Sequence, residues 1–186
     1  VSVISNLPVG DNLHDHVFAA GIDFRVNRKD IPSLKRSLSF TDSNILQYIS
    51  SKDGPLTSFG GIEAIAFVNT KYVNISLDWP DVQLVLVNGN MNDNHFDLLE
   101  HILDDMNQTD SKKLFSILPV LLRPNSRGSV KLRSTNPYDK PIIDPKYLTH
   151  PEDIMTMVAA MKIALAVGTS VPFKDIGSRL ILPLLE

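Results

Sequence analysis

The sequence predicts an α+β fold, in which an antiparallel or mixed β-sheet is backed by helices. Several segments alternate apolar and polar residues with the period of two that is typical of strands, and others repeat apolar residues at helical spacing. Expected strands follow one another directly in places, instead of alternating strictly with helices as in a parallel sheet. The 186 residues include 43% hydrophobic and 21% charged residues, an ordinary composition for a globular domain that buries a core.

Five segments are expected to form strands. The first places Phe18, Ala20, Ile22, Phe24 and Val26 on one face, because side chains two apart in a strand point the same way. The expected strands span residues 17–26, 62–68, 82–87, 114–122 and 128–133.

Two of these strands carry specific expectations. The strand 114–122 contains Pro119, which has no N–H donor, so we expect the strand to lie at a sheet edge or to be bulged there. In 128–133 the alternation predicts that Val130 and Leu132 point inward, while Lys131 and Arg133 point outward.

Three segments are expected to form helices. Thr41 is a suitable N-cap for a first helix, which Gly54 and Pro55 would close, and a second helix is expected around residues 96–106. The strongest helical pattern runs from Pro151 to Val167, with Gly168 as its expected stop. Its expected apolar stripe is Ile154, Met157, Val158, Met161 and Leu165.

Composition excludes several classes of function. The net charge of −3 argues against a nucleic-acid partner, which requires a basic surface. No apolar run reaches the ~20 residues of a membrane span. Cysteine is absent, which excludes disulfides and thiol chemistry. The sequence also contains no P-loop, no Gly-x-Gly-x-x-Gly and no Gly-x-Ser-x-Gly motif.

The densest group of titratable residues is His14-Asp15-His16. Two histidines at this spacing in a strand could hold a metal, but no third ligand follows from the spacing. We therefore expect no metal site, and instead a turn locked by hydrogen bonds from Asp15 or His16.

A second notable group is the turn from Arg123 to Gly128, which contains Arg123 and Arg127. Their guanidinium groups could clamp an anion or a carboxylate. Alternatively, they could pair with the acidic surface or cap backbone carbonyls, and this structural interpretation is favoured. Two glycosylation sequons begin at Asn74 and Asn107, and they matter only if the chain enters the secretory route.

The arginine turn lies within a longer run, Leu-Leu-Arg-Pro-Asn-Ser-Arg-Gly-Ser-Val-Lys-Leu-Arg-Ser, at residues 121–134. A second run, Leu-Pro-Val-Gly-Asp-Asn-Leu-His-Asp-His, occupies residues 7–16. Together with 54–58, 66–70, 79–83, 136–137, 141–148 and 151–153, these runs resemble the glucose-methanol-choline (GMC) oxidoreductases, most closely the arthropod glucose-dehydrogenase type. The resemblance covers nearly the whole chain, with its segments in the family's order.

The resemblance implies a division of the chain. Residues 1–16 would be the end of a flavin-domain region, and residues 17–186 mainly a substrate-binding domain, both belonging to a longer chain. Family members oxidise an alcohol carbon while FAD takes a hydride. The family's dinucleotide fingerprint would precede Val1 and its catalytic histidine pair would follow Glu186. We therefore expect no catalytic residue in this segment, and no FAD held by it alone.

Two sets of site residues follow from the resemblance. Asn12, Asp15 and His16 match the family's Val-Gly-x-Asn-Leu-x-Asp-His peptide, and they are expected to support the flavin site. The stretch before the arginine turn is expected to form the wall of the substrate pocket, through Ser116, Leu118 and Val120.

Two functions remain open. The first is the substrate-binding portion of a secreted, extracellular FAD-dependent oxidoreductase that acts on CH–OH groups of alcohols or sugars. Its partners would be the small substrate and the flavin-binding domain of the same parent chain, and the isolated segment would be inactive and would self-associate. The second is a non-catalytic binding protein or degenerate paralogue on the same fold. A glycine fingerprint before Val1 and a histidine pair after Glu186 would distinguish the first from the second.

Overall fold

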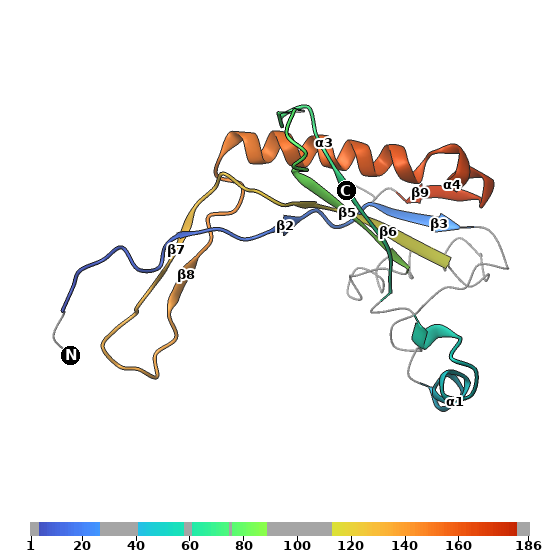
Figure 1. Cartoon of the computed structure of the whole chain (residues 1–186), viewed down its shortest axis with the longest axis horizontal. Coiled ribbons are helices and arrows are strands. Elements are labelled where there is room, and N and C mark those ends of the chain that lie inside the picture. Colours follow the sequence, from blue (N-terminus) through green and yellow to red (C-terminus); the bar gives the residue numbers. More distant parts are fainter. Residues whose placement is uncertain (1–3, 27–40, 58–60, 75, 89–112, 182–186) are drawn as a thin grey trace, which may run out of the picture.

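The computed structural model describes residues 4–26, 41–57, 61–74, 76–88 and 113–181. It contains a six-stranded sheet, a separate three-stranded sheet and one long helix (Figure 1). Every strand pair in the described residues is antiparallel. The expected α+β fold is confirmed, in its antiparallel form.

The larger sheet has β4 and β9 at its edges and β6 at its centre. Strand β6 pairs with β5 on one side and with β2 and β3 on the other. The strands are β2 (Val17–Phe18), β3 (Asp23–Val26), β4 (Ile62–Val68), β5 (Val82–Asn88), β6 (Lys113–Leu121) and β9 (Ser178–Ile181).

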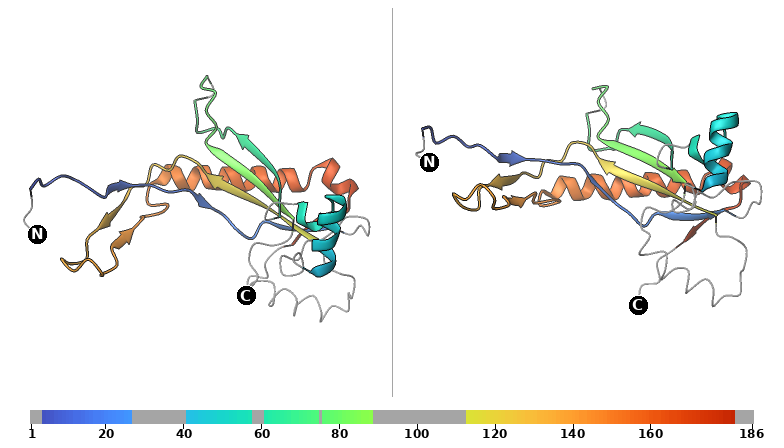
Figure 2. Two further views of the ribbon diagram at one scale, coloured as in Figure 1. Left: turned by 60° about the horizontal axis from the view of Figure 1, so that its bottom comes forward. Right: turned by 90° about the horizontal axis from the view of Figure 1, so that it is seen from below.

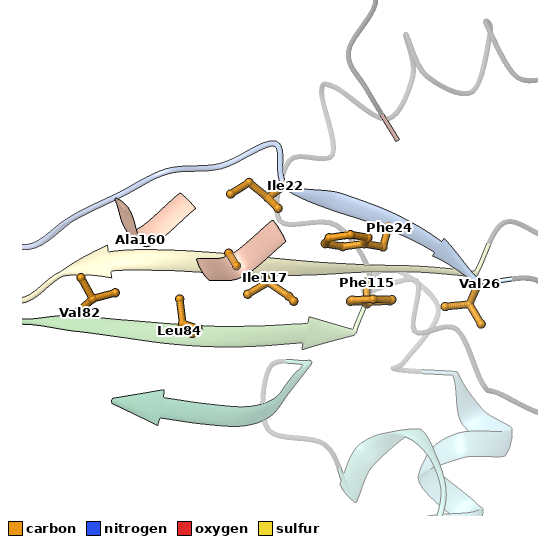
Figure 3. Close-up of a cluster of buried hydrophobic side chains, with 9 residues drawn as sticks. Ile22, Phe24, Val26, Val82, Leu84, Phe115, Ile117 and Ala160 are labelled. Atoms are coloured by element: carbon orange, nitrogen blue, oxygen red, sulfur yellow. The ribbon is translucent and has the colours of Figure 1, made fainter. Parts of the chain in front are cut away.

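Helices α3 (Pro151–Gly168) and α4 (Val171–Asp175) cover one face of this sheet. The Phe24 and Phe115 rings stack there with their centroids 5.0 Å apart (Figure 3), and Phe173 stacks on Phe115 at 5.1 Å. The buried cluster also contains Ile22, Val26, Val82, Leu84, Ile117, Ala160 and Ala164. Burial of these side chains provides the main apolar driving force for packing α3 on the sheet.

The face of α3 that meets the sheet differs from the expected apolar stripe. Met157 is buried and Met161 and Leu165 are half-buried, but Ile154 and Val158 are 49% and 44% exposed. The fully covered positions are instead the small residues Ala160 and Ala164, both 0% exposed, and Gly168. Small residues let the helix backbone come closer to the sheet, and this close approach rotates the bulky branched residues to the outer side.

Gly168 is therefore more than a helix stop. It is the last residue of α3, and a Cβ atom placed on it would lie 2.2 Å from the Cζ atom of Phe24. Only glycine leaves room for this ring. The helix ends at Gly168, as expected, and its C-cap is Thr169, whose φ is −104°.

The expected strand 17–26 is divided into β2 and β3 by a bulge. Phe18 pairs with Val120 and Asp23 pairs with Ser116, so four residues of the first chain segment face three of β6. Gly21, at φ +85°, lies within the bulge. Positive φ is readily adopted by glycine.

The bulge also explains how β6 accommodates Pro119. An edge position for this strand is wrong, because β6 is central. The Pro119 carbonyl accepts a hydrogen bond from the Ala19 N–H at 3.1 Å, at the level of the bulge. The N–H that proline lacks therefore faces an irregular part of the ladder, as the bulge alternative required.

The smaller sheet consists of β1 (Asp11–Leu13), β7 (Gly128–Lys131) and β8 (Ile142–Asp144). It forms an arm beyond the N-terminal end of α3 (Figures 1 and 2). The expectation that 128–133 belongs to the main sheet is wrong, and Leu132 is 88% exposed instead of inward. Pairing of β1 with β7 joins the two sides of the expected boundary at residue 16.

Helix α1 (Asp42–Ser51) begins at Thr41, as expected, and the Thr41 Oγ1 accepts a hydrogen bond from the Asn44 N–H at 3.3 Å. A short 3-10 turn, η2 (Pro55–Thr57), follows it. The expected helix around 96–106 lies outside the described residues.

Gly168→Ala should destabilise the protein by about 1–3 kcal/mol, although alanine is the better helix former, because the added methyl group overpacks the Phe24 site. Urea unfolding monitored by circular dichroism measures this loss. The matched control is the double variant Phe24→Leu/Gly168→Ala. If the two substitutions cost the sum of their separate effects, the close contact does not limit the residue at 168.

Candidate functional site

A cavity of about 550 Å³ lies where the chain passes between the two sheets. A second cavity, of about 320 Å³, shares Trp79, Arg123, Pro124 and Arg127 with the first. The first is lined by His14, Asp15, His16, Trp79, Leu122, Arg123, Pro124 and Arg127. The two notable sequence groups, the histidine pair and the arginine turn, are thus brought together by the fold.

Arg123 holds the loop that precedes β5. Its guanidinium carbon lies 3.9 Å from the centroid of the Trp79 ring, a distance that permits a cation–π interaction. The same group donates hydrogen bonds to the Pro80 carbonyl at 2.5 Å and the Trp79 carbonyl at 2.6 Å. Trp79 was not among the expected site residues, because a single tryptophan before a turn carries no spacing signal.

Arg127 fastens its own turn. Its Nη1 donates to the Pro124 carbonyl at 2.5 Å and to the Ser126 carbonyl at 3.0 Å. Both arginines therefore cap backbone carbonyls, which agrees with the structural interpretation of the turn. The alternative, an anion clamp, would require these donors to face a ligand.

Asp153 connects the arginine turn to α3. This carboxylate is only 1% exposed. It accepts hydrogen bonds from the Asn125 N–H at 2.7 Å, from the Ser126 N–H at 2.8 Å and from the Ser126 hydroxyl at 2.5 Å. The Ser126 hydroxyl also accepts a hydrogen bond from the His150 N–H at 3.0 Å. The sequence does not predict this contact, because an acidic residue in the first turn of a helix is common and does not indicate a particular partner.

These contacts determine the charge of Asp153. Burial alone would raise its pKa. The Ser126 hydroxyl, the two backbone N–H groups and the nearby His150 oppose this effect and bring the pKa below the ordinary 3.8. Asp153 is therefore a carboxylate at neutral pH, and it serves as a structural anchor.

Asp15 ties the arm to the segment that leads into α3. One carboxylate oxygen accepts the His16 N–H at 2.8 Å, which locks the local turn as expected, and the other accepts the Tyr147 hydroxyl at 2.8 Å. The hydrogen bond to Asp15, followed by burial and the charge of Asp15, raises the pKa of Tyr147 above 10.0.

Of the three residues expected near the flavin, Asp15 and His16 line the larger cavity. Asn12 lies in β1 with a positive φ of 67° and does not line it. In the described part of the chain, no three His, Asp or Glu residues gather into a set that could hold a metal ion.

The expected pocket-wall residues lie elsewhere, on the sheet face opposite α3. Ser116, Leu118 and Val120 alternate with Phe115 and Ile117, which face the helix, so they share the other face. Leu118 clusters there with Val85, Val87 and Val120. Ser116 is 1% exposed and donates a hydrogen bond to the Asp23 carboxylate at 2.5 Å. None of these three residues lines either of the two cavities described above.

Comparison with known proteins identifies relatives. Residues 124–180 match the family model of the GMC oxidoreductases. The chain is 29% identical, over 97% of its length, to a Drosophila melanogaster protein named glucose dehydrogenase [FAD, quinone]. It is 31% identical, over 90% of its length, to a Pseudomonas putida alcohol dehydrogenase [acceptor]. It spans only 27% and 28% of the lengths of these relatives.

Solved structures show the same fold. A formate oxidase matches 94% of this chain with a TM-score of 0.68 at 21% identity, and the chain covers 32% of that structure. A pyridoxine 4-oxidase from Mesorbium loti matches 100% of this chain with a TM-score of 0.65 at 20% identity, and the chain covers 30% of it. Separately, none of the helices in the described part of the chain combines the length and apolar character of a membrane span.

Asp153→Asn should cost about 1–3 kcal/mol at neutral pH, because an amide replaces a carboxylate that accepts three hydrogen bonds. The folded-state pKa is lowered, so the contribution of Asp153 is fully present above its unfolded pKa near 4 and is lost as pH falls through the lower, folded value. Unfolding free energies measured between pH 7 and pH 2 should show this dependence in wild type and less of it in the variant. The control is Glu152→Gln, since the Glu152 side chain is exposed and accepts a hydrogen bond from the Asn125 side chain; an equal effect would contradict the role of Asp153.

Arg123→Ala should release Trp79, which is the only tryptophan in the sequence. We expect stronger acrylamide quenching of its fluorescence and a loss of about 1–2 kcal/mol, from the cation–π contact and two hydrogen bonds. Arg133→Ala is the control, because Arg133 bonds the Lys140 carbonyl on the arm. Unchanged quenching in Arg123→Ala would show that another group holds the loop.

Proposed function

Because this chain is a relative of the GMC oxidoreductases over nearly all of its length, we propose that it is the substrate-binding portion of an FAD-dependent oxidoreductase acting on CH–OH groups. Its substrates are small alcohols or sugars, and its partner is the flavin-binding domain of the same parent chain. In this proposal residues 17–186 form the substrate-binding domain, and residues 1–16 end the flavin-domain region. The parent protein is extracellular.

The observation that carries the proposal is the division of the main sheet into two different faces. One face is closed by α3 and α4. On the other face, Phe18 and Gln83 flank Val120, and Phe67 lies beyond Gln83. In the next row, Ile65, Val85 and Leu118 lie side by side. A rigid apolar wall of this kind suits one side of a small-molecule pocket.

Exposure supports an external cover for part of this wall. Phe18, Ile65 and Phe67 are 50%, 51% and 60% exposed, although each is large and apolar. A contiguous apolar surface commonly marks a binding site or an interface. In the parent chain, substrate and flavin-binding domain would both meet this face.

The residues present fit FAD only at the margin of its site. The space beside Gly10 and Gly128 is already occupied by protein. A Cβ atom on Gly10 would collide with the carbonyl oxygen of Val130, and one on Gly128 with that of Asp144. The Asp15 carboxylate already accepts Tyr147 and His16. We therefore assign Asn12, Asp15 and His16 a supporting position beside the flavin domain. When bound, FAD supplies the hydride acceptor.

The second candidate is a non-catalytic binding protein or degenerate paralogue on this fold. It is favoured by the structural role of both arginines in the turn, whose guanidinium groups donate hydrogen bonds to backbone carbonyls. Flavin absorbance and alcohol-dependent dye reduction by the full-length parent protein separate the two candidates. Stoichiometric flavin with turnover supports the oxidoreductase, and a colourless parent protein supports the binding protein.

The chain of residues 1–186 alone should be colourless and should not reduce dye with glucose, choline or simple alcohols, because hydride transfer needs a bound cofactor and a positioned base. Its exposed apolar wall should also make it self-associate in size-exclusion chromatography. Copurifying flavin at one equivalent, or dye reduction that depends on added FAD, would show that the cofactor site lies within this segment.

Val120→Phe in the full-length protein should lower kcat/KM for its alcohol or sugar substrate by about tenfold, because the larger ring fills the pocket that Val120 lines. The flavin content should stay at the wild-type level. Val158→Phe is the control, since Val158 is 44% exposed on the outer side of α3. Equal kinetics in the two variants would remove Val120 from the pocket wall.

A further inference from the structure

Two arginines lie directly opposite each other on the main sheet. The pairing of β3 with β9 aligns Arg25 with Arg179. Their neighbours Phe24, Val26 and Leu180 pack toward α3, so alternation places both arginines on the opposite face. This is the face that also holds Ser116 and Leu118.

Neither guanidinium has a hydrogen bond or an ion pair within the described chain, in contrast to Arg123, Arg127 and Arg133, which donate to backbone carbonyls. Directly opposed side chains have Cβ atoms only ~4.5–5.5 Å apart, and like charges in this position repel. Asp23, two residues before Arg25, is 8% exposed and accepts a hydrogen bond from Ser116. The two arginines therefore place two positive charges side by side, and no carboxylate of the described residues forms an ion pair with either of them.

Protection of a sheet edge does not explain the pair. Strand β9 is an edge strand, and charged residues on edges discourage pairing with other chains. This accounts for Arg179, which is exposed. It does not account for Arg25, which is half-buried in β3, between β6 and β9.

We propose that Arg25 and Arg179 together bind one oxyanion, a carboxylate or phosphate group. Two adjacent guanidinium forks match the planar or tetrahedral oxygens of such a group and would relieve their mutual repulsion. The biological role of this oxyanion site rests on the proposed function, because the two arginines lie on the face that is proposed to meet the substrate. The oxyanion then belongs either to a substrate that carries an acidic group besides its alcohol, or to an acidic side chain from the rest of the parent chain.

Inorganic phosphate is the probe for a group that comes from solution. Calorimetric titration of the full-length protein, at constant ionic strength, compares wild type with Arg25→Gln and Arg179→Gln. Each variant should bind phosphate about tenfold more weakly or worse, equivalent to losing one charged contact. Arg133→Gln is the matched control, because this arginine lies on the arm and should leave phosphate binding unchanged.

Melting temperatures without phosphate test for an internal carboxylate. They are measured for the same proteins at ~0.01 M and ~1 M salt, where the screening length falls from ~30 Å to ~3 Å. If the parent chain supplies the carboxylate, wild type does not bind phosphate, and Arg25→Gln and Arg179→Gln lower the melting temperature at low salt only. Arg25→Lys and Arg179→Lys keep the positive charge and should therefore lower the melting temperature less than the glutamine variants do.

Either pattern supports the proposal and identifies the source of the oxyanion. The proposal is overturned if phosphate binds equally to wild type and both glutamine variants. It is also overturned if wild type does not bind phosphate and the substitutions leave the melting temperature unchanged at both salt concentrations. Flavin absorbance and alcohol-dependent turnover, measured on the same preparations, report the proposed function separately, so the failure of one does not imply the failure of the other.

Discussion

The position of α3 on the sheet is determined by a contact at each end of the helix. At its N-terminal end, Asp153 accepts hydrogen bonds from Asn125 and Ser126, in the turn between β6 and β7. At its C-terminal end, Gly168 leaves space for the ring of Phe24. Together these two contacts set the position of the helix along the sheet and the side that it presents to the sheet.

Hydrogen bonding of buried polar groups also explains the junction between the two sheets. Loop carbonyls in such a junction must find donors, and Arg123 and Arg127 provide them. The cavity lined by arginines and histidines is thus largely a product of satisfying backbone groups. On the opposite face of the main sheet, Ser116 and Asp23 bond each other, while the exposed part of the apolar wall and the Arg25–Arg179 pair are the proposed contacts for partners.

The sequence-based expectations about packing were least accurate where the backbone of α3 comes closest to the sheet. The spacing of Ile154, Met157, Val158, Met161 and Leu165 correctly indicates a helix, but hydrophobicity alone favours the bulky side of that helix. Met157 is buried and Met161 and Leu165 pack against the core, as expected, but Ile154 and Val158 are exposed. The positions that are covered completely are Ala160 and Ala164, because a close approach to the sheet depends on small side-chain volume. Likewise, Pro119 correctly indicates an irregular ladder, yet only the pairing with both neighbours shows that its strand is central.

The sequence by itself determined the α+β class, most strands, the Thr41 cap and the resemblance to the GMC oxidoreductases, because these depend on local periodicity, caps and contiguous motifs. Only the tertiary structure decided that β7 joins β1 in a separate sheet, that Asp153 anchors the arginine turn, and that Arg25 faces Arg179. These contacts join residues between 27 and 154 positions apart in the chain. Such contacts depend on sheet register and side-chain volume, and these cannot be predicted from a local sequence pattern.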